Sequence, residues 1–164
     1  MHRLILALAL ALAACVAAPQ IAGFRPASAP IWSSAAFLPA KIEGSWTQAA
    51  TFSAGKGPGC APGGLRFGRT GAGLAVQGKL CLNGKMQRIA GVMRPSGPGR
   101  MTLPGMAEWW VIWVDADYRT LAIGTPDGSF GFILDRGKIG ADRLRAAAEI
   151  FTFNGYAKGR LFAY

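Results

Sequence analysis

Histidine is almost absent from this chain of 164 residues, since the only one is His2. We expect the N-terminal segment that contains it to be removed on export, which leaves the mature chain with none. Without histidine the chain lacks the commonest general base and the commonest metal ligand, and it cannot form a Ser-His-Asp or Cys-His catalytic group. We therefore predict that the protein is not an enzyme and that it uses no cofactor and no metal.

Acidic residues are also scarce: eight stand against 18 Lys and Arg, and none lies between Gly44 and Ala107. The one closely spaced pair, Asp115 and Asp117, falls in a predicted strand turn, where carboxylates usually make turn hydrogen bonds. The cations of the acid-free half either form solvated strand faces and turns or lie against an anionic membrane surface. A nucleic-acid partner is the other common reason for a basic chain, but an exported protein rarely meets one, so we predict none.

One apolar run stands out, 11 residues from Leu4 to Ala14 behind a basic N-terminal tip. It is shorter than the roughly 17–25 residues that span a bilayer, and the arrangement is typical of an export signal. Its end, Leu12-Ala13-Ala14-Cys15, resembles the lipobox of bacterial lipoproteins. That resemblance implies a signal peptide at residues 1–14, cleavage before Cys15 and acylation of that cysteine. The alternative is ordinary secretory cleavage near Ala18.

The cysteines agree with export. Of the three, the lipobox would use Cys15, which leaves Cys60 and Cys81 as a pair. A two-residue turn at Thr70-Gly71 would place this pair face to face across a hairpin, with Cα atoms about 4.5 Å apart and within reach of a disulfide. The bond should form in an oxidising compartment, and closing a loop of about 20 residues suggests about 3 kcal/mol of stabilisation. The alternative is two buried free thiols.

Glycine and proline are frequent, at 23 and 10 residues, which predicts many turns and few helices. From Gly44 on, the apolar period is mostly two, with turn signals every 8–12 residues, as in an all-β sandwich or barrel. We predict an all-β fold, an eight-stranded antiparallel up-and-down barrel. The predicted strands are 45–52, 64–68, 74–82, 85–93, 100–103, 108–114, 118–125 and 129–135.

A single helix is predicted near the C-terminus. Apolar residues recur there at helical spacing up to Phe151, after Asp142 as the predicted N-cap and before Gly155 as a C-terminal glycine. The segment 15–40 is rich in Pro, Ala and Ser, which is typical of a tether. It also contains four large apolar residues, so we expect its later part to pack against a single folded domain at 41–164.

Three motifs within residues 41–160 resemble those of the lipocalin family, in particular its bacterial outer-membrane lipoproteins. They are Gly44-Ser45-Trp46 at the first strand, Asp115-Ala116-Asp117-Tyr118 at the turn between the sixth and seventh strands, and Arg136 after the last strand. The resemblance implies that Trp46 and Arg136 pack together at the closed end of the barrel, a cation–π contact of about 0.5–2 kcal/mol. Gly44, Trp46, Asp117, Tyr118 and Arg136 are therefore predicted to be structural residues.

The stretch 53–107 matches the family less well, because it is rich in glycine and a hairpin disulfide is not the usual lipocalin bridge. In these respects the chain is similar to small bacterial β-barrel inhibitors of metalloproteases, which also begin with a Gly-x-Trp strand. The alternative function is therefore a protein-binding module such as a protease inhibitor, acting through the segment before Gly44 or through a loop.

The predicted sixth strand, Trp109 to Val114, is apolar on both faces, so one face meets the interior and the other is covered or exposed. In the next strand small residues alternate with large ones, and a hollow interior favours the face with the small residues. The lipocalin resemblance implies the same face. It implies that five further residues line the cavity with those small ones, so the predicted ligand-binding residues are Trp109, Val111, Trp113, Thr120, Ala122, Gly124, Phe130 and Phe132. The alternative is that these aromatic residues fill a small solid core.

The lipocalin resemblance implies a fatty acid or lysophospholipid as the ligand, with its chain inside the barrel. Burying each methylene contributes about 0.8 kcal/mol, and a basic residue near the mouth would meet the carboxylate or phosphate. The predicted function is reversible binding of such a lipid for storage or transport. Because Val16 rather than Asp follows Cys15, the same resemblance implies attachment to the outer membrane, facing the periplasm. The oligomeric state stays open.

Overall fold

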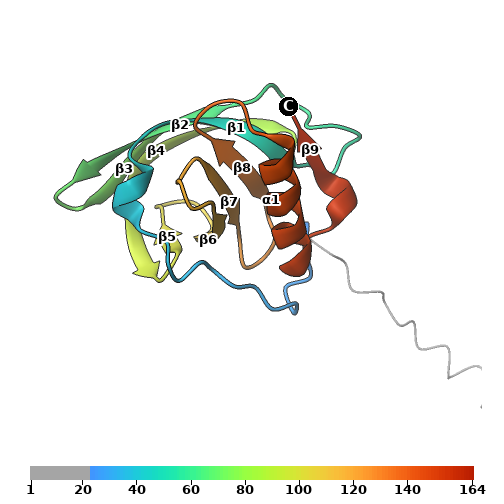
Figure 1. The fold of residues 1–164 in the computed structure, drawn as a ribbon, viewed down its shortest axis with the longest axis horizontal. Helices are drawn as coiled ribbons and strands as arrows, with labels where there is room; N and C mark the ends of the chain where they lie inside the picture. The colour runs from blue at the N-terminus through green and yellow to red at the C-terminus, as the bar shows by residue number, and fades with distance from the viewer. Residues whose placement is uncertain (1–22) are drawn as a thin grey trace, which may run out of the picture.

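The barrel is closed. A computed structural model describes residues 23–164, so the predicted signal peptide and Cys15 lie outside the described residues. Antiparallel strands follow one another in the order β2-β3-β4-β5-β6-β7-β8-β1, and β1 also pairs with β2 (Figure 1). The strands are β1 (Gly44–Phe52), β2 (Gly64–Thr70), β3 (Gly73–Leu82), β4 (Lys85–Gly97), β5 (Arg100–Thr102), β6 (Trp109–Val114), β7 (Thr120–Gly124), β8 (Gly131–Asp135) and β9 (Leu161–Ala163). The predicted eight-stranded antiparallel barrel is thus confirmed.

One α-helix follows the barrel strands, α1 (Ala141–Phe153), as predicted. Its N-cap is Gly140, so the prediction of Asp142 as the N-cap was wrong. Gly140 is the last residue with extended backbone and accepts the first intrahelical hydrogen bond, whereas Asp142 lies in the first turn, where its charge suits the helix dipole. Gly155, with φ +80°, lies just beyond the helix as expected. No helix within residues 23–164 is long and apolar enough to cross a membrane.

The predicted Cys60–Cys81 disulfide is present, with the two Cα atoms 5.8 Å apart. The predicted hairpin register was wrong by two residues, because the turn lies at Gly71-Ala72 and Thr70 pairs with Gly73. The Thr70 hydroxyl explains the shift, since it donates to the Gly73 carbonyl and accepts from the Ala72 amide. Cys60 therefore precedes β2 and reaches β3 from the loop, not from a facing strand position.

The apolar residues divide between an interior core and a helix-side core. Twenty buried apolar residues, contributed by the barrel strands and the segments beside them, form the interior core. The helix-side core lies between the outer face of the barrel and α1, where the ring of Phe52 meets those of Phe151 and Tyr156, each with centroids 4.8 Å away. The short strand β9, which the sequence did not predict, extends this side by pairing with the end of β1. The barrel thus buries apolar residues on both faces of β7 and β8.

Residues 23–38, here called the strap, lie against the barrel before the 3₁₀ helix η1 (Pro39–Ile42) begins. Phe24 joins the helix-side core, and its amide donates to the Gly128 carbonyl. Arg25 is only 1 % exposed; its guanidinium donates to the carbonyls of Asn154, at 2.9 Å, and of Pro126 and Ala29. One buried cation therefore joins the strap, the loop after β7 and the C-terminal end of α1.

Replacing Arg25 with methionine is expected to lower the free energy of unfolding by about 2–3 kcal/mol, because buried carbonyls lose charge-assisted donors. Denaturant unfolding measures the change. The matched control is Arg145→Met on the exposed side of α1, which should stay within about 0.5 kcal/mol of the parent protein. Equal behaviour of the two variants would show that the Arg25 contacts do not hold the strap.

One end of the barrel, here called the base, is closed by η1. The Trp46 indole N–H donates to the Ile42 carbonyl at 2.7 Å, and the Arg136 guanidinium lies 4.3 Å from the centre of the Trp46 ring. Arg136 also donates to the Tyr118 carbonyl at 2.9 Å, to a backbone carbonyl within η1 and to the carbonyl just after it. A Cβ at Gly44, where φ is +108°, would lie 3.0 Å from the Arg136 guanidinium, so this position favours glycine.

Tyr118 completes the base at the turn between β6 and β7. Its backbone has a φ of +53°, and its hydroxyl accepts from the Leu38 amide and donates to the Ala36 carbonyl. The carboxylate that makes the turn hydrogen bonds is that of Asp115. It accepts from the amide of the last residue before β7 and from the amide of the first residue of β7. Asp117 makes no side-chain hydrogen bond to any residue in the range 23–164.

Candidate ligand site at the open end of the barrel

The open end of the barrel lies opposite the base and is surrounded by the loops 53–63, 83–84, 103–108 and 125–130. Three of these loops converge on a pocket of about 380 Å³, here called the mouth pocket. That volume lies within the range of about 300–1,000 Å³ found for small-molecule sites. The pocket is lined by Leu82, Asn83, Lys85, Gln87, Gly105, Met106, Ala107, Ser129 and Phe130.

The lining of the mouth pocket is amphipathic. Leu82, Met106 and Phe130 supply apolar surface, while Lys85 and Gln87 supply hydrogen-bond donors from the start of β4. Neither of the two ion pairs formed among residues 23–164 involves Lys85. An ammonium group above an apolar floor is suited to an amphiphile whose polar end is negatively charged.

Lys85 is the one basic residue in the lining of the mouth pocket, and a basic residue near the mouth was expected from the sequence without being named. The signal was present in β4, where Ile89 and Met93 point into the interior core. Because side chains alternate along a strand, Gln87 and Lys85 lie on the same face, at the rim. Counting back by two from the buried residues of β4 would have found them.

An aromatic layer lies directly beneath the mouth pocket. Phe130 meets the edge of Trp109, with ring centroids 6.3 Å apart, and Trp109 meets Phe132 at 5.1 Å. Trp109 is 1 % exposed, and its indole N–H has no hydrogen-bond partner among the described residues. A buried donor without a partner costs about 1–3 kcal/mol.

Below that layer the interior is occupied by the protein's own side chains. Trp109, Val111, Phe130 and Phe132 all belong to the interior core, together with Leu134 and residues of the opposite strands. The alternative of a core filled by aromatic residues therefore describes this region better than a hollow tube. At the open end of the barrel, the cavity that a ligand could enter is the mouth pocket.

Half of the predicted site residues lie elsewhere, and the predicted face of β7 was wrong. Ala122 belongs to the helix-side core, Trp113 packs against it, and a Cβ at Gly124 would lie 2.7 Å from the Tyr156 hydroxyl. Thr120 donates to the Asp135 carboxylate. The small residues of β7 leave room for α1 and the segment after it, not for a ligand.

A bulge explains why Trp113 does not follow Trp109 and Val111 into the interior. The pairing between β6 and β7 shifts between Val111 and Trp113, so the alternation of faces breaks at Ile112. On β7 the interior positions are Leu121 and Ile123, which the sequence placed outside.

Thr120 instead takes part in a buried polar contact between the barrel and α1. The Arg143 guanidinium donates to the Thr120 hydroxyl at 2.8 Å and to Asp135 at 3.3 Å. Asp135 is fully buried, so this ion pair fixes the start of α1 against β7 and β8. The group is structural, since it lies on the helix side of the barrel and away from the mouth pocket.

Glu108, beside the mouth, is held on the outer face. Its carboxylate accepts the Ser96 hydroxyl and the Trp110 indole N–H, the latter at 2.7 Å, and these hydrogen bonds hold the pKa of Glu108 below its usual value. The Arg100 guanidinium lies 4.3 Å from the centre of the Trp110 ring. Glu108 is therefore ionised at neutral pH but bound to its own neighbours. Within residues 23–164 no group of three or more His, Cys, Asp or Glu side chains is placed to hold a metal ion.

Solved structures identify the fold. Apocrustacyanin A1 from lobster is similar with a TM-score of 0.54 and 15% identity, covering 76% of this chain and 77% of that one. The siderocalin Ex-FABP is similar with a TM-score of 0.57 and 13% identity, covering 75% and 93%. The barrel has the lipocalin fold. At these identities the likeness concerns the lipocalin fold alone. No protein-family model and no curated protein sequence matches the chain.

Proposed function

We propose that the protein is a membrane-anchored, lipocalin-like lipoprotein that reversibly binds a fatty acid or lysophospholipid for storage or transport. The observation that carries the proposal is the mouth pocket, with an apolar floor at Phe130 and Leu82 and the ammonium group of Lys85 at its rim. The acyl chain would contact the floor, gaining about 0.8 kcal/mol for each buried methylene. The carboxylate or phosphate would meet Lys85 in a charge-assisted hydrogen bond.

A protein of the same fold supports binding as the kind of function. The siderocalin Ex-FABP is described as functioning through dual ligand specificities. The mouth pocket combines the apolar side chains of Leu82 and Phe130 with the hydrogen-bond donors of Lys85 and Gln87. These features suit a ligand with an apolar body and a few polar atoms.

The proposed anchor is Cys15, acylated after export and attached to the outer membrane on its periplasmic side. The described chain begins at Gly23, and the Phe24 amide bonds to Gly128 in a loop of the open end. Eight residues from Cys15 to Gly23 can span at most about 30 Å at the full extension of the chain. An anchored Cys15 would therefore keep the mouth close to the bilayer, where lipids can exchange. Two acyl groups or more would make this attachment stable, whereas a single one gives only marginal binding.

A second candidate is a protein-binding module such as a protease inhibitor. The observation that favours it is an exposed aromatic pair, Trp32 on the strap and Phe153 at the end of α1, with ring centroids 5.4 Å apart. Their exposed fractions are 51 % and 68 %. Large aromatic residues at a surface are common anchors of protein interfaces.

Titration of delipidated protein with a fluorescent fatty acid separates these candidates. We expect saturable binding, weakened about tenfold or more by Lys85→Gln, because one charge-assisted hydrogen bond is lost. The matched control is Lys56→Gln in the loop 53–63, which does not line the mouth pocket. Absence of binding, together with inhibition of a secreted protease that Trp32→Ala abolishes, would favour the second candidate.

A further inference from the structure

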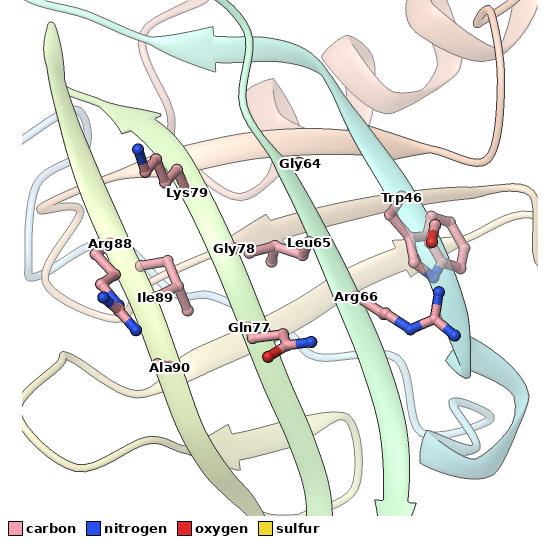
Figure 2. A pocket seen from close by; sticks show the side chains of 11 residues that line it. Trp46, Gly64, Leu65, Arg66, Gln77, Gly78, Lys79, Arg88, Ile89 and Ala90 are labelled. Atoms are coloured by element: carbon pink, nitrogen blue, oxygen red, sulfur yellow. The ribbon is translucent and has the colours of Figure 1, made fainter.

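The outer face of β2, β3 and β4 carries a groove of about 590 Å³ on the side of the barrel away from α1 (Figures 1 and 2). Figure 2 shows Arg66, Gln77, Lys79 and Arg88 along it, each from one of three neighbouring strands. The geometry points to a second binding site there, for a phosphate-bearing ligand. We call it the outer groove. It is separate from the mouth pocket, with which it shares no lining residue.

The strand register places two cations face to face in the outer groove. Lys79 on β3 lies directly opposite Arg88 on β4, and both side chains are exposed. Like charges at directly opposed positions destabilise a sheet. On its other side Lys79 lies opposite Gly64 of β2, which has no side chain to cover the ammonium group.

Two residues along the strands, a second row completes the set of donors. Gln77 on β3 lies opposite Arg66 on β2 and opposite Ala90 on β4. The small residues Gly64 and Ala90 thus stand at opposite corners of a patch whose other members are long donor side chains. The outer groove is hollow because these two residues are small, and the donor side chains surround it.

No acidic residue balances these charges. The stretch between Gly44 and Ala107 contains neither Asp nor Glu, and the ion pairs within residues 23–164 are Arg69–Glu43 and Arg143–Asp135. Three cations thus lie within two neighbouring rows of one sheet, whose adjacent strands are about 5 Å apart. An anion bound among them would remove the repulsion between Lys79 and Arg88.

The donor set selects phosphate among anions. Arginine binds phosphate with two parallel N–H donors, whereas lysine adds a point charge and Gln77 an uncharged N–H donor. Three positive charges suit a group with more than one negative charge, such as a phosphate monoester or a diphosphate. The one aromatic ring of the lining, Trp46, is buried in the interior core. Stacking of nucleic-acid bases in the outer groove therefore has no support.

Pyrophosphate is the probe for this site, titrated at low ionic strength into the full chain carrying Cys15→Ser. We expect saturable shifts of the Gln77 side-chain amide signals in nuclear magnetic resonance spectra. Arg88→Gln and Lys79→Gln should each weaken binding about tenfold or more. Arg94→Gln is the matched control, an exposed arginine on the same strand that does not line the groove, and it should change affinity less than twofold.

Two readouts keep the interpretation clear. Without pyrophosphate, Lys79→Gln should unfold at the same denaturant concentration as the parent or a higher one, because it removes the repulsion from Arg88. Arg88→Gln should leave fatty-acid binding at the mouth unchanged, so binding at the outer groove and binding at the mouth pocket are tested independently. The absence of saturable shifts, or equal weakening by Arg88→Gln and Arg94→Gln, would overturn the outer groove as a site.

Vesicles identify the source of the phosphate. The phosphate is a lipid headgroup if the chain binds anionic phospholipid vesicles, if Arg88→Gln abolishes that binding, and if added pyrophosphate displaces the chain from the vesicles. If pyrophosphate alone binds in this pattern, the ligand is a soluble phosphate ester. Both results support the same chemistry at Arg66, Lys79 and Arg88.

Discussion

Replacing Trp109 with alanine is expected to lower the free energy of unfolding by about 3–5 kcal/mol, the usual cost of removing a large buried aromatic side chain. The Trp109 ring packs edge-on against both Phe130 and Phe132 in the interior core and is almost fully buried. The missing indole would leave a void that the barrel strands cannot close, because their hydrogen bonds fix the spacing around it. Chemical denaturation followed by circular dichroism measures the loss.

Trp32→Ala provides the comparison, since it removes a tryptophan that is half exposed on the strap. We expect it to cost less than about 1 kcal/mol, as for surface substitutions in general. If Trp109→Ala were as mild as Trp32→Ala, the interior would not depend on the aromatic layer. The floor of the mouth pocket would then be mobile, and not the fixed surface that the proposed ligand site requires.

Removing the Cys60–Cys81 disulfide is expected to lower the free energy of unfolding by about 3 kcal/mol, because the unfolded chain loses a closed loop. The two cysteines are 21 residues apart in sequence. The Gln48 side chain still holds the backbone of Cys81 after the bond is lost, with hydrogen bonds of 2.8 Å to both its carbonyl and its amide. We therefore expect Cys60→Ala/Cys81→Ala to fold, with a lower unfolding midpoint.

Cys15→Ser is the control for this variant, since it removes a thiol that is not part of the bridge. Its unfolding midpoint should match that of the parent chain in unlipidated protein. An unchanged midpoint in the double variant would mean that the bond does not restrict the unfolded chain under these conditions. Reduction of the parent protein should reproduce the double variant, which excludes an effect of the new side chains.

The strands could be predicted from the sequence because their signals are local. Alternation of apolar residues and glycine-rich turns located all eight barrel strands, and the spacing after Asp142 located α1. The errors occurred where a long-range contact decides the outcome. The β6 bulge at Ile112 changes which residues face inward, and no local pattern marks it.

Small residues misled the prediction of the site for a physical reason. Ala122 and Gly124 indicate that something lies close to the strand, but the sequence does not say whether a ligand or the protein itself fills that space. In the structure Tyr156 lies against Gly124. Arg25 was missed for a related reason, because a buried arginine bonded to carbonyls of distant loops has the same sequence signature as a solvated one.

The most direct test of ligand binding at the mouth is the set of intermolecular nuclear Overhauser effects from a bound, isotopically distinguished fatty acid. We predict contacts from its methylene protons to the ring of Phe130 and the methyl groups of Leu82, with the carboxylate end near Lys85. Contacts to the helix-side residues Ala122 and Trp113 instead, or no saturable contacts at all, would contradict a ligand site at the open end of this barrel.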